Sequence, residues 1–422
     1  MLPSSQVADP MDDSEKEKTE VSEDFIQVKN DEESTTKSPI ALSSAPSFPE
    51  GGLQGWLTIF GAFLIQYTCF GYINSFGVYE DYYTRHYLTH YTPSDIGSYL
   101  LAGTLILNSL GLFMLSLTHE NSYYQIFLSH GVMMGLATGI TYVASLGIAG
   151  HYFHKRRPIA VGIISAGSAL GAVLNPIMLN KFFNGPIGFH RGVRISAGIN
   201  TALLLIALAI MRTRLPPQHA KKFPVGQWMR EPAYVSALIG CLFVFFGLFY
   251  PVFSLQLMAV KHGVDSKFAF YAVSILNVAS CFGRTLPQLL APKVGVFNLS
   301  AVMTIFTGVI IFSMVAIKDI TGTILFAIFF GFFSGAAIAV TPAMIAHLCT
   351  GGPAEFGTRL GIYFGVGSII GLFATPLSGA LLTTDYLWVR PIIFNGVMMT
   401  VSGLFYGVTR IFYGRGKDKW LL

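Results

Sequence analysis

Long apolar stretches dominate this chain and limit what it can fold into. They lie near residues 55–79, 99–117, 123–150, 158–184, 194–211, 233–258, 268–290, 296–317, 321–346, 360–382 and 388–410. Because the hydrocarbon core of a bilayer is about 30 Å thick, a helix needs about 20 apolar residues to cross it. Lipid cannot satisfy backbone polar groups, so runs of this length must be helices. The sequence therefore predicts an all-α polytopic membrane protein with eleven spans.

The composition excludes an ordinary soluble protein. Charged residues make up 12% of the chain and hydrophobic residues 52%, whereas a soluble domain has about 25% charged residues. Residues 1–50 hold 12 acidic and 4 basic residues, and most other cations lie in short loops between apolar runs. This placement is typical of a membrane protein and not of a nucleic-acid reader. We expect a lipid bilayer as the surroundings and no nucleic-acid partner.

The longest break between apolar runs suggests how the chain is organised. Residues 212–232 are basic and contain Pro, and we interpret them as a cytosolic linker. They separate an N-terminal helical half of five spans, residues 51–211, from a C-terminal half of six spans, residues 233–412. Residues 1–50 have the composition of a disordered acidic tail, and residues 413–422 form a basic cytosolic tail. Two helical halves are the layout of repeat-built transporters.

Lys and Arg residues in the short loops predict the orientation of the chain. Counted from residue 118 onward, one set of alternate loops holds fourteen of them and the other holds six. The first set includes Lys155, Arg156 and Arg157 and should face the cytosol. These three cations therefore mark a tight cytosolic turn between two spans.

Small residues follow that turn at helical spacing. Gly162, Gly167 and Gly171 are among them. Without the bulk of a Cβ atom, helix backbones can approach closely in lipid. Such smooth contacts suit helices that rock against each other, although static packing explains the spacing equally well. We predict that these glycines lie at helix contacts.

Four segments have the pattern of a known family. HYFHKRRPIAVGIISAGSALG at 151–171 matches a signature that opens a fifth helix, and PEGGLQGW at 49–56 matches the approach to a first helix. FGRTLPQLLAPKVG at 282–295 and GTRLGIYFGVGSIIGLFATPLSGALL at 357–382 match the eighth and eleventh helices. Together they resemble the monocarboxylate porter branch of the major facilitator superfamily over residues 49–412. The sequence looks most like the fungal members of that branch. The resemblance implies a two-half bundle of twelve helices that transports by alternating access, with a co-transported proton.

The chain departs from that family in its number of spans. After TPSDIGS at 92–98 the sequence continues with YLLAGTLILNSLGLFMLSL, which looks like the family's third helix. The second helix of the N-terminal half is therefore missing. Eleven spans with a cytosolic C-terminus place the N-terminus outside. A non-transporting membrane sensor or scaffold, or a defective truncated product, is the alternative that this departure leaves open.

One cation stands out within the spans. Arg284 is retained at a position where the resemblance implies a substrate-binding Arg, whereas Asn74 and Ser280 replace a Lys and an Asp of the family's animal members. An Arg inside a membrane costs about 2.5–3.5 kcal/mol on insertion scales and usually faces a cavity or a partner. Its planar fork suits a carboxylate. Snorkelling toward the cytosolic edge is the alternative.

Polar side chains on the same helix extend this candidate site. Asn277 and Arg284 are seven residues apart and share a helix face, with Ser280 between them. Interhelical hydrogen bonding is the usual alternative for such side chains. The predicted substrate-binding set is Arg284, Ser280, Asn277, Asn74, Tyr67 and Gln256.

The sequence thus predicts a secondary-active transporter of a small organic anion, monocarboxylate or carboxylate-bearing secondary metabolite, by export or uptake. We expect no cofactor and no metal, and we expect a monomer in the plasma membrane, with a vacuolar or other internal membrane as the alternative. An intramembrane enzyme would need paired acids or His clusters within the spans, and the sequence has none there, so we do not expect an enzyme.

Overall fold

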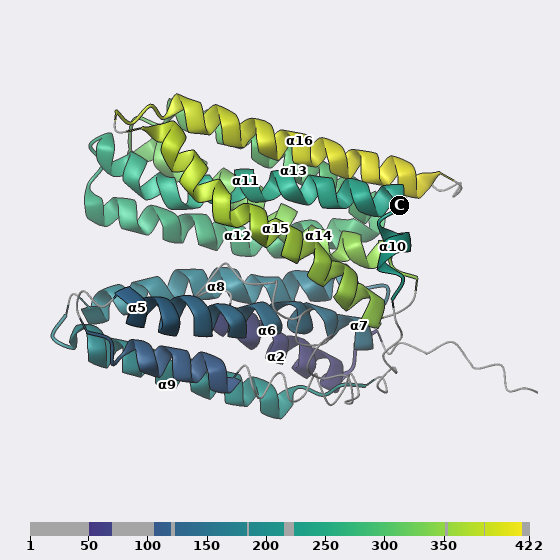
Figure 1. Cartoon of the computed structure of the whole chain (residues 1–422), viewed down its shortest axis with the longest axis horizontal. Helices are drawn as coiled ribbons and strands as arrows, with labels where there is room; N and C mark the ends of the chain where they lie inside the picture. The colour runs from purple at the N-terminus through teal and green to yellow at the C-terminus, as the bar shows by residue number, and fades with distance from the viewer. Residues whose placement is uncertain are drawn as a thin grey trace, which may run out of the picture. The chain divides into compact units, whose positions relative to one another are not determined.

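The computed structural model describes residues 50–69, 105–119, 123–183, 185–214, 223–350, 353–383 and 385–415. Within these ranges the regular elements are all helical (Figure 1), so the predicted all-α fold is confirmed. The elements are α2 (Leu53–Cys69), α5 (Tyr123–Ile126), the π-helix η1 (Phe127–Met134), α6 (Gly135–Gly147), α7 (Ala149–Tyr152), α8 (Arg157–Phe183), α9 (Gly188–Ile210), α10 (Val225–Trp228), α11 (Pro232–Lys261), α12 (Ser266–Val294), α13 (Val296–Ser313), the 3-10 helix η2 (Met314–Ala316), α14 (Ile320–Leu348), α15 (Pro353–Leu382) and α16 (Val389–Gly414).

The spans coincide with the apolar runs of the sequence. Among the described residues, nine helical segments are long and apolar enough to cross a membrane. Two further apolar helices, α2 and Leu105–Leu115, are shorter and border parts of the chain outside the described ranges. Nine of the eleven predicted spans are therefore found among the described residues, and the two shorter helices lie within the other two predicted spans.

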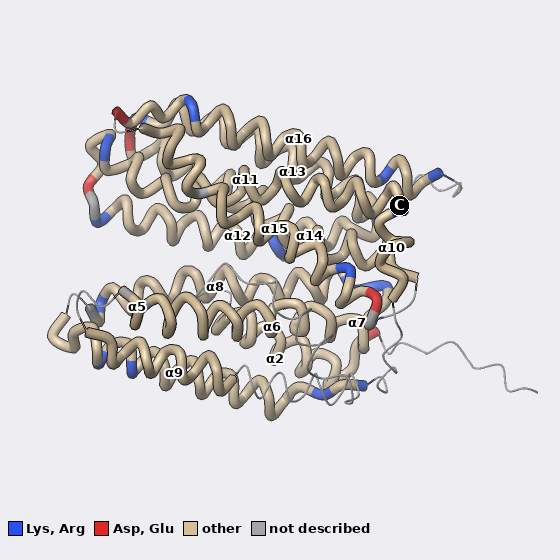
Figure 2. Tube along the Cα trace, viewed as in Figure 1, with Lys and Arg blue, Asp and Glu red and all other residues tan. Residues whose placement is uncertain are grey.

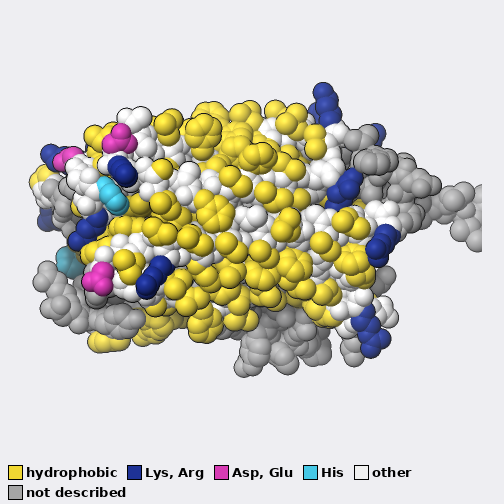
Figure 3. Space-filling view, turned by 90° about the horizontal axis from the view of Figure 1, so that it is seen from above, with side chains coloured by type: hydrophobic (Ala, Val, Ile, Leu, Met, Phe, Trp, Pro, Cys, Tyr) yellow, Lys and Arg dark blue, Asp and Glu magenta, His cyan; other side chains and the backbone are white. Residues whose placement is uncertain are grey.

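The distribution of side chains on the surface fits a bilayer. Figure 2 shows most charged residues near the two ends of the helices, and Figure 3 shows a broad hydrophobic belt between charged ends. Large apolar side chains such as Phe253, Leu289 and Leu372 lie within the long helices α11, α12 and α15 and are more than half exposed. Lipid can cover such side chains, whereas a soluble monomer rarely exposes large apolar patches.

The helices pack in two groups that meet along α8 and α12. In the N-terminal half, α2 packs against α6, α8 and α9. In the C-terminal half, α11 packs against α15 and α16, α13 against α16, and α12 against α14. The contact between α8 and α12 is the most extensive one across the two halves. Figure 1 shows these two groups one above the other.

Glycine permits the closest backbone contacts of α8. A Cβ atom on Gly167 or Gly171 would overlap the backbone carbonyl oxygen of Phe63 or Tyr67 on α2. A Cβ atom on Gly162 would lie 2.6 Å from the carbonyl oxygen of Arg284 on α12. Gly167 and Gly171 therefore set the distance to α2, and Gly162 sets the distance between the two halves.

Glu50 ties the beginning of α2 to the basic turn before α8. Its carboxylate accepts hydrogen bonds from the backbone N–H groups of His154 (3.0 Å), Lys155 (2.7 Å) and Arg156 (3.1 Å). Partial burial alone would raise its pKa, but these N–H groups and the nearby His154 outweigh it, so the pKa of this carboxyl lies below its ordinary value. Glu50 has a φ of 46° and Gly52 one of 87°, a region that glycine adopts readily. α2 therefore begins beside the basic turn.

The direction of α2 differs from the one that counting eleven spans implied. At one end of α9, His190 Nδ1 lies 3.0 Å from the carbonyl oxygen of Ser116, just after Leu105–Leu115. At the other end of α9, Gln54 near the beginning of α2 donates to the carbonyl of Ile210 (3.1 Å). Hence α2 and Leu105–Leu115 both begin at the same end of the helix bundle. The basic turn lies at that end, which the loop charges predict to be cytosolic. The predicted loss of a span after residue 98 lies outside the described residues.

The end of the predicted linker is anchored to the C-terminal half. Arg359 on α15 makes a two-pronged ion pair with Glu231, with N···O distances of 2.5 and 2.9 Å, and a second ion pair with Glu355 at 2.7 Å. Its guanidinium carbon also lies 4.6 Å from the centroid of the Trp228 ring in α10. Arg359 is 2% exposed, so this cluster fixes the linker to the beginning of α15.

Candidate functional site

A cavity lies among α6, α11, α12, α14 and α15. Its empty volume, counted with its open mouth, is about 1160 Å³. Most of its walls are apolar, as is usual for small-molecule sites. The lining residues are Thr138, Gly139, Tyr142, Val143, Val244, Phe245, Leu248, Phe249, Val252, Leu276, Asn277, Ser280, Arg284, Ser334, Ala337, Ile338, Thr341, Tyr363, Phe364 and Ser368.

Arg284 is the only charged residue among these lining residues. It is 6% exposed, and it lies in α12 one turn after Ser280. Its Nε donates to the Ser280 hydroxyl (3.2 Å), and its Nη1 donates to the carbonyl of Ser165 on α8 (2.9 Å) and to the hydroxyl of Ser168. The side chain therefore reaches from the C-terminal half to the N-terminal half.

The partners of Arg284 do not neutralise its charge. All three acceptors are uncharged oxygens, and no ion pair joins Arg284 to a carboxylate in the described part of the chain. Arg stays protonated in proteins, and a buried charge is costly unless an opposite charge pairs with it. The geometry of this site can therefore accept an anion.

The structure brings together three of the six predicted binding residues. Asn277, Ser280 and Arg284 line the cavity from one face of α12. Tyr67 is half-buried on α2, and Gln256 is exposed on α11 near Leu257; neither lines the cavity. Asn74 lies outside the described residues. The polar character of Tyr67 and Gln256 gave no information about the side of the helix on which each one lies.

Aromatic lining residues were not singled out from the sequence. Tyr142, Phe245, Phe249 and Phe364 contribute rings to the cavity. Phe245, Phe249 and Val252 follow helical spacing on α11, but lipid-facing stripes in this chain have the same spacing. Only the packing of the two halves distinguishes a stripe that lines a cavity from one that faces lipid.

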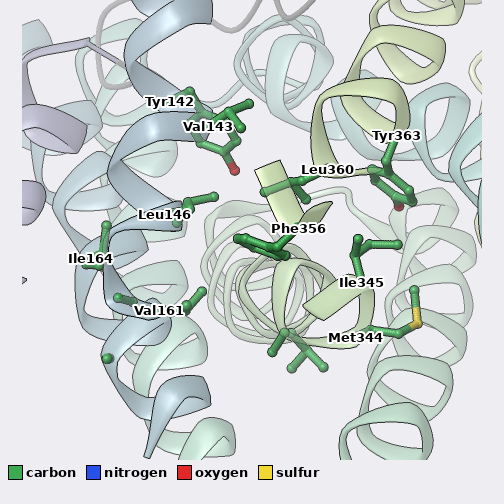
Figure 4. Packing of buried hydrophobic residues seen from close by; sticks show 14 of the residues in the cluster. Tyr142, Val143, Leu146, Val161, Ile164, Met344, Ile345, Phe356, Leu360 and Tyr363 are labelled. Carbon is green, nitrogen blue, oxygen red and sulfur yellow. The ribbon is translucent and has the colours of Figure 1, made fainter. Parts of the chain in front are cut away.

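A buried apolar cluster closes the cavity toward the basic turn. Figure 4 shows its members from both halves, with side chains of α6 and α8 facing those of α14 and α15. Ten of its residues are Tyr142, Val143, Leu146, Val161, Ile164, Met344, Ile345, Phe356, Leu360 and Tyr363. Each is at most 8% exposed, so the described parts of the two halves pack closely here, at the end of the cavity that lies toward the basic turn.

The three cations of the basic turn have different surroundings. Lys155 and Arg156 are exposed, as expected of a loop. Arg157 departs from the predicted loop position, because it begins α8 and its guanidinium carbon lies 4.2 Å from the centroid of the Phe356 ring. The apolar cluster attracts its long side chain inward, as happens for amphipathic side chains. Arg157 therefore packs against the apolar cluster at the end of the bundle where the basic turn lies.

Comparison with known proteins identifies the family. The sequence profile of the Major Facilitator Superfamily matches residues 98–327. The aspyridones efflux protein apdF of Emericella nidulans is 35% identical over 419 residues, which cover 93% of this chain and 85% of that protein. The chain belongs to the Major Facilitator Superfamily. As a member, it is a multi-pass membrane transporter.

Other relatives and one crystal structure agree with this assignment. The MFS-type transporter dbaD of Emericella nidulans is 34% identical over 401 residues, covering 88% of this chain and 89% of that protein. The agnestins efflux protein AgnL12 of Paecilomyces divaricatus is 31% identical over 415 residues, covering 91% and 94%. The E. coli fucose:proton symporter FucP superposes with a TM-score of 0.62 at 15% identity, covering 84% of this chain and 92% of that one. The last similarity confirms the predicted two-half fold.

Proposed function

We propose that this superfamily member exports small organic anions that carry a carboxylate or a similarly acidic group, by secondary-active alternating access. The observation that carries the proposal is the buried Arg284 guanidinium, which lines the cavity and has only uncharged acceptors among the described residues. An anion in the cavity would supply the missing opposite charge. Export is favoured over uptake because relatives that cover most of the chain are named as efflux proteins of fungal metabolites.

The position of Arg284 also suggests how binding drives movement. Its hydrogen bonds to Ser165 and Ser168 join α12 to α8 across the two halves. A substrate anion competes with these neutral acceptors for the same guanidinium N–H groups. Binding then weakens the hydrogen bonds that join the two halves. The substrate thereby favours the conformation in which the halves have separated, because a ligand shifts an equilibrium toward the state that it binds better. Rocking of the halves around a central site follows the scheme of repeat-built transporters.

Features of the sequence support placing the chain in the monocarboxylate porter branch. Two of the four motifs that carry that resemblance, around Glu50 and around Lys155, are joined by hydrogen bonds. We further propose a monomer in the plasma membrane, with a vacuolar or other internal membrane as the alternative. A co-transported proton is part of this proposal, and flux with and without an imposed pH gradient tests it.

Flux in proteoliposomes tests the proposed function. Vesicles that contain the purified protein are given labelled aromatic and aliphatic carboxylates, and Arg284→Gln is compared with the wild type. A hydrogen bond to a charged group is worth about 1.5–3 kcal/mol, so we expect a loss of at least about tenfold in kcat/KM. Arg390→Gln, which removes an exposed cation at the beginning of α16, is the matched control.

Two outcomes contradict the proposal. Full flux by Arg284→Gln would show that Arg284 does not bind the substrate. Absence of flux for every anion, with a correctly inserted protein, would instead favour a non-transporting membrane sensor or scaffold.

A further inference from the structure

We infer that the substrate has a flat aromatic or conjugated body, which lies against four rings of the cavity while its acidic group pairs with Arg284. We call these rings the aromatic wall; they belong to Tyr142, Phe245, Phe249 and Phe364, and all four line the cavity that contains Arg284. The inference rests on the proposed function, because it specifies the substrate class of the same site.

The rings of the aromatic wall form two neighbouring pairs. Phe245 and Phe249 are one turn apart on α11, with ring centroids 5.8 Å apart and ring planes at 61°. Tyr142 of α6 meets Phe364 of α15 edge to face, at 5.0 Å and 85°. The second pair spans the two halves of the protein, so a body bound against it contacts both halves.

The ring faces are accessible from the cavity. Phe245, Phe249 and Phe364 are only half-buried by protein, although all three lie inside the bundle as cavity lining. Tyr142 is 8% exposed and forms the floor, where the apolar cluster begins. An aromatic surface that the protein leaves partly uncovered inside a cavity is available to a ligand.

The position of one ring is fixed by glycines of α15. A Cβ atom on Gly367 would overlap the Phe245 ring, and one on Gly371 would lie 3.5 Å from it. The ring therefore packs directly on the helix backbone at Gly367. A rigid surface of this kind loses little conformational entropy when a ligand binds, which favours affinity.

The chemistry of the lining points to the same class of ligand. A short aliphatic monocarboxylate has no ring to set against the four rings of the cavity, so it would leave water there. A planar π system can stack on the rings or meet their edges, and each good aromatic pair strengthens binding by about twofold to tenfold beyond burial alone. A saturated ring of the same size gains the burial but not the pairing.

Three matched probes separate aromatic pairing from hydrophobicity and from charge. They are 2-naphthoate, decahydro-2-naphthoate and 2-naphthamide, and their affinities for the purified full-length protein are measured by calorimetry. We expect 2-naphthoate to bind at least about threefold more tightly than the saturated acid. Phe249→Leu should bring this ratio close to one, whereas Phe282→Leu on the exposed side of α12 should leave it unchanged.

Each outcome supports or overturns one of the two proposals. Equal affinity of the aromatic and saturated acids in the wild type overturns the aromatic wall, and this comparison needs no variant to fold. A preference that survives Phe249→Leu unchanged also overturns it. If 2-naphthamide binds as tightly as 2-naphthoate while the aromatic preference persists, the pairing of an anion with Arg284 is overturned and the aromatic wall is supported.

Discussion

The guanidinium carbon of Arg157 lies 4.2 Å from the centroid of the Phe356 ring, and this contact joins the first turn of α8 to the first turn of α15. The Nε and Nη2 atoms of Arg157 are buried and have no hydrogen-bond acceptor among the residues that the structure describes. The ring face therefore stabilises a guanidinium charge whose hydrogen bonds are incomplete. Such cation–π contacts are strongest when water is excluded. Phe356 belongs to the apolar cluster, which lies at the end of the bundle that the loop charges predict to be cytosolic.

Removal of the ring should open this side more often. A desolvated cation–π pair is worth about 2 kcal/mol, so Phe356→Leu should raise the population of cytosol-open molecules by up to about thirtyfold. The measurement is the labelling rate of Ile338→Cys, a cavity position, by an impermeant maleimide added from the cytosolic side. The four native cysteines are replaced beforehand in the protein used for labelling.

The control for this experiment keeps the ring. Phe356→Tyr should label at the rate of the unmodified protein, because the ring face over Arg157 is retained. An equal rate for Phe356→Leu would show that the contact does not hold the cytosolic side closed.

Close packing of α8 on α2 predicts a large effect of one added methyl group. A Cβ atom on Gly167 would overlap the backbone of Phe63, so the helices must separate, and overpacking of this kind costs about 1–3 kcal/mol. Gly198→Ala on α9, where no atom lies within 4 Å of the added Cβ, should be neutral or slightly stabilising. Thermal unfolding of the purified variants checks this; a Gly167→Ala protein as stable as Gly198→Ala would contradict the contact.

The fold was predictable from the sequence because the bilayer leaves few choices. Any apolar run that can cross the hydrocarbon core must be a helix, and in the described part of the chain each of the eleven runs contains a helix. The direction of α2 was not predictable by counting. A count assumes that each span runs in the opposite direction to the span before it, so an error in the number of spans reverses the direction assigned to α2. The contact between Glu50 and Lys155 decides the direction of α2, and it joins residues about a hundred positions apart.

The candidate site was predictable where a rare residue type marked it. Arg284 is conspicuous in an apolar helix, and Ser280 and Asn277 follow from it by helical spacing. Tyr67 and Gln256 were as polar but lie away from the cavity. The aromatic wall was not predictable, because Phe249 inside the cavity and Phe253 on the exposed face lie one turn apart on the same helix.

The hydrogen bonds of Glu50 predict a pH-dependent contribution to stability. Because the pKa of Glu50 is lower in the folded protein than in an unfolded chain, its contribution is fully present above the unfolded pKa of about 4.3. It is lost as the pH falls through the folded pKa. Glu50→Gln should therefore lower the Tm by about 2 °C at neutral pH, and the difference from the wild type should disappear in acid. A difference that is constant over this range would mean that the charge of Glu50 does not matter.

The same contact predicts the side of the membrane on which the chain enters α2. If the basic turn is cytosolic, as the loop charges predict, then Glu50 beside His154 is cytosolic too. An N-glycosylation acceptor placed before residue 50 should stay unmodified in a eukaryotic host. A flexible insert that carries the same acceptor after Gly263, between α11 and α12, should be modified, because α11 begins at the cytosolic linker and ends on the other side. Modification of the N-terminal acceptor would mean that α2 enters the bilayer from outside, and the bonds between Glu50 and the basic turn could not then form.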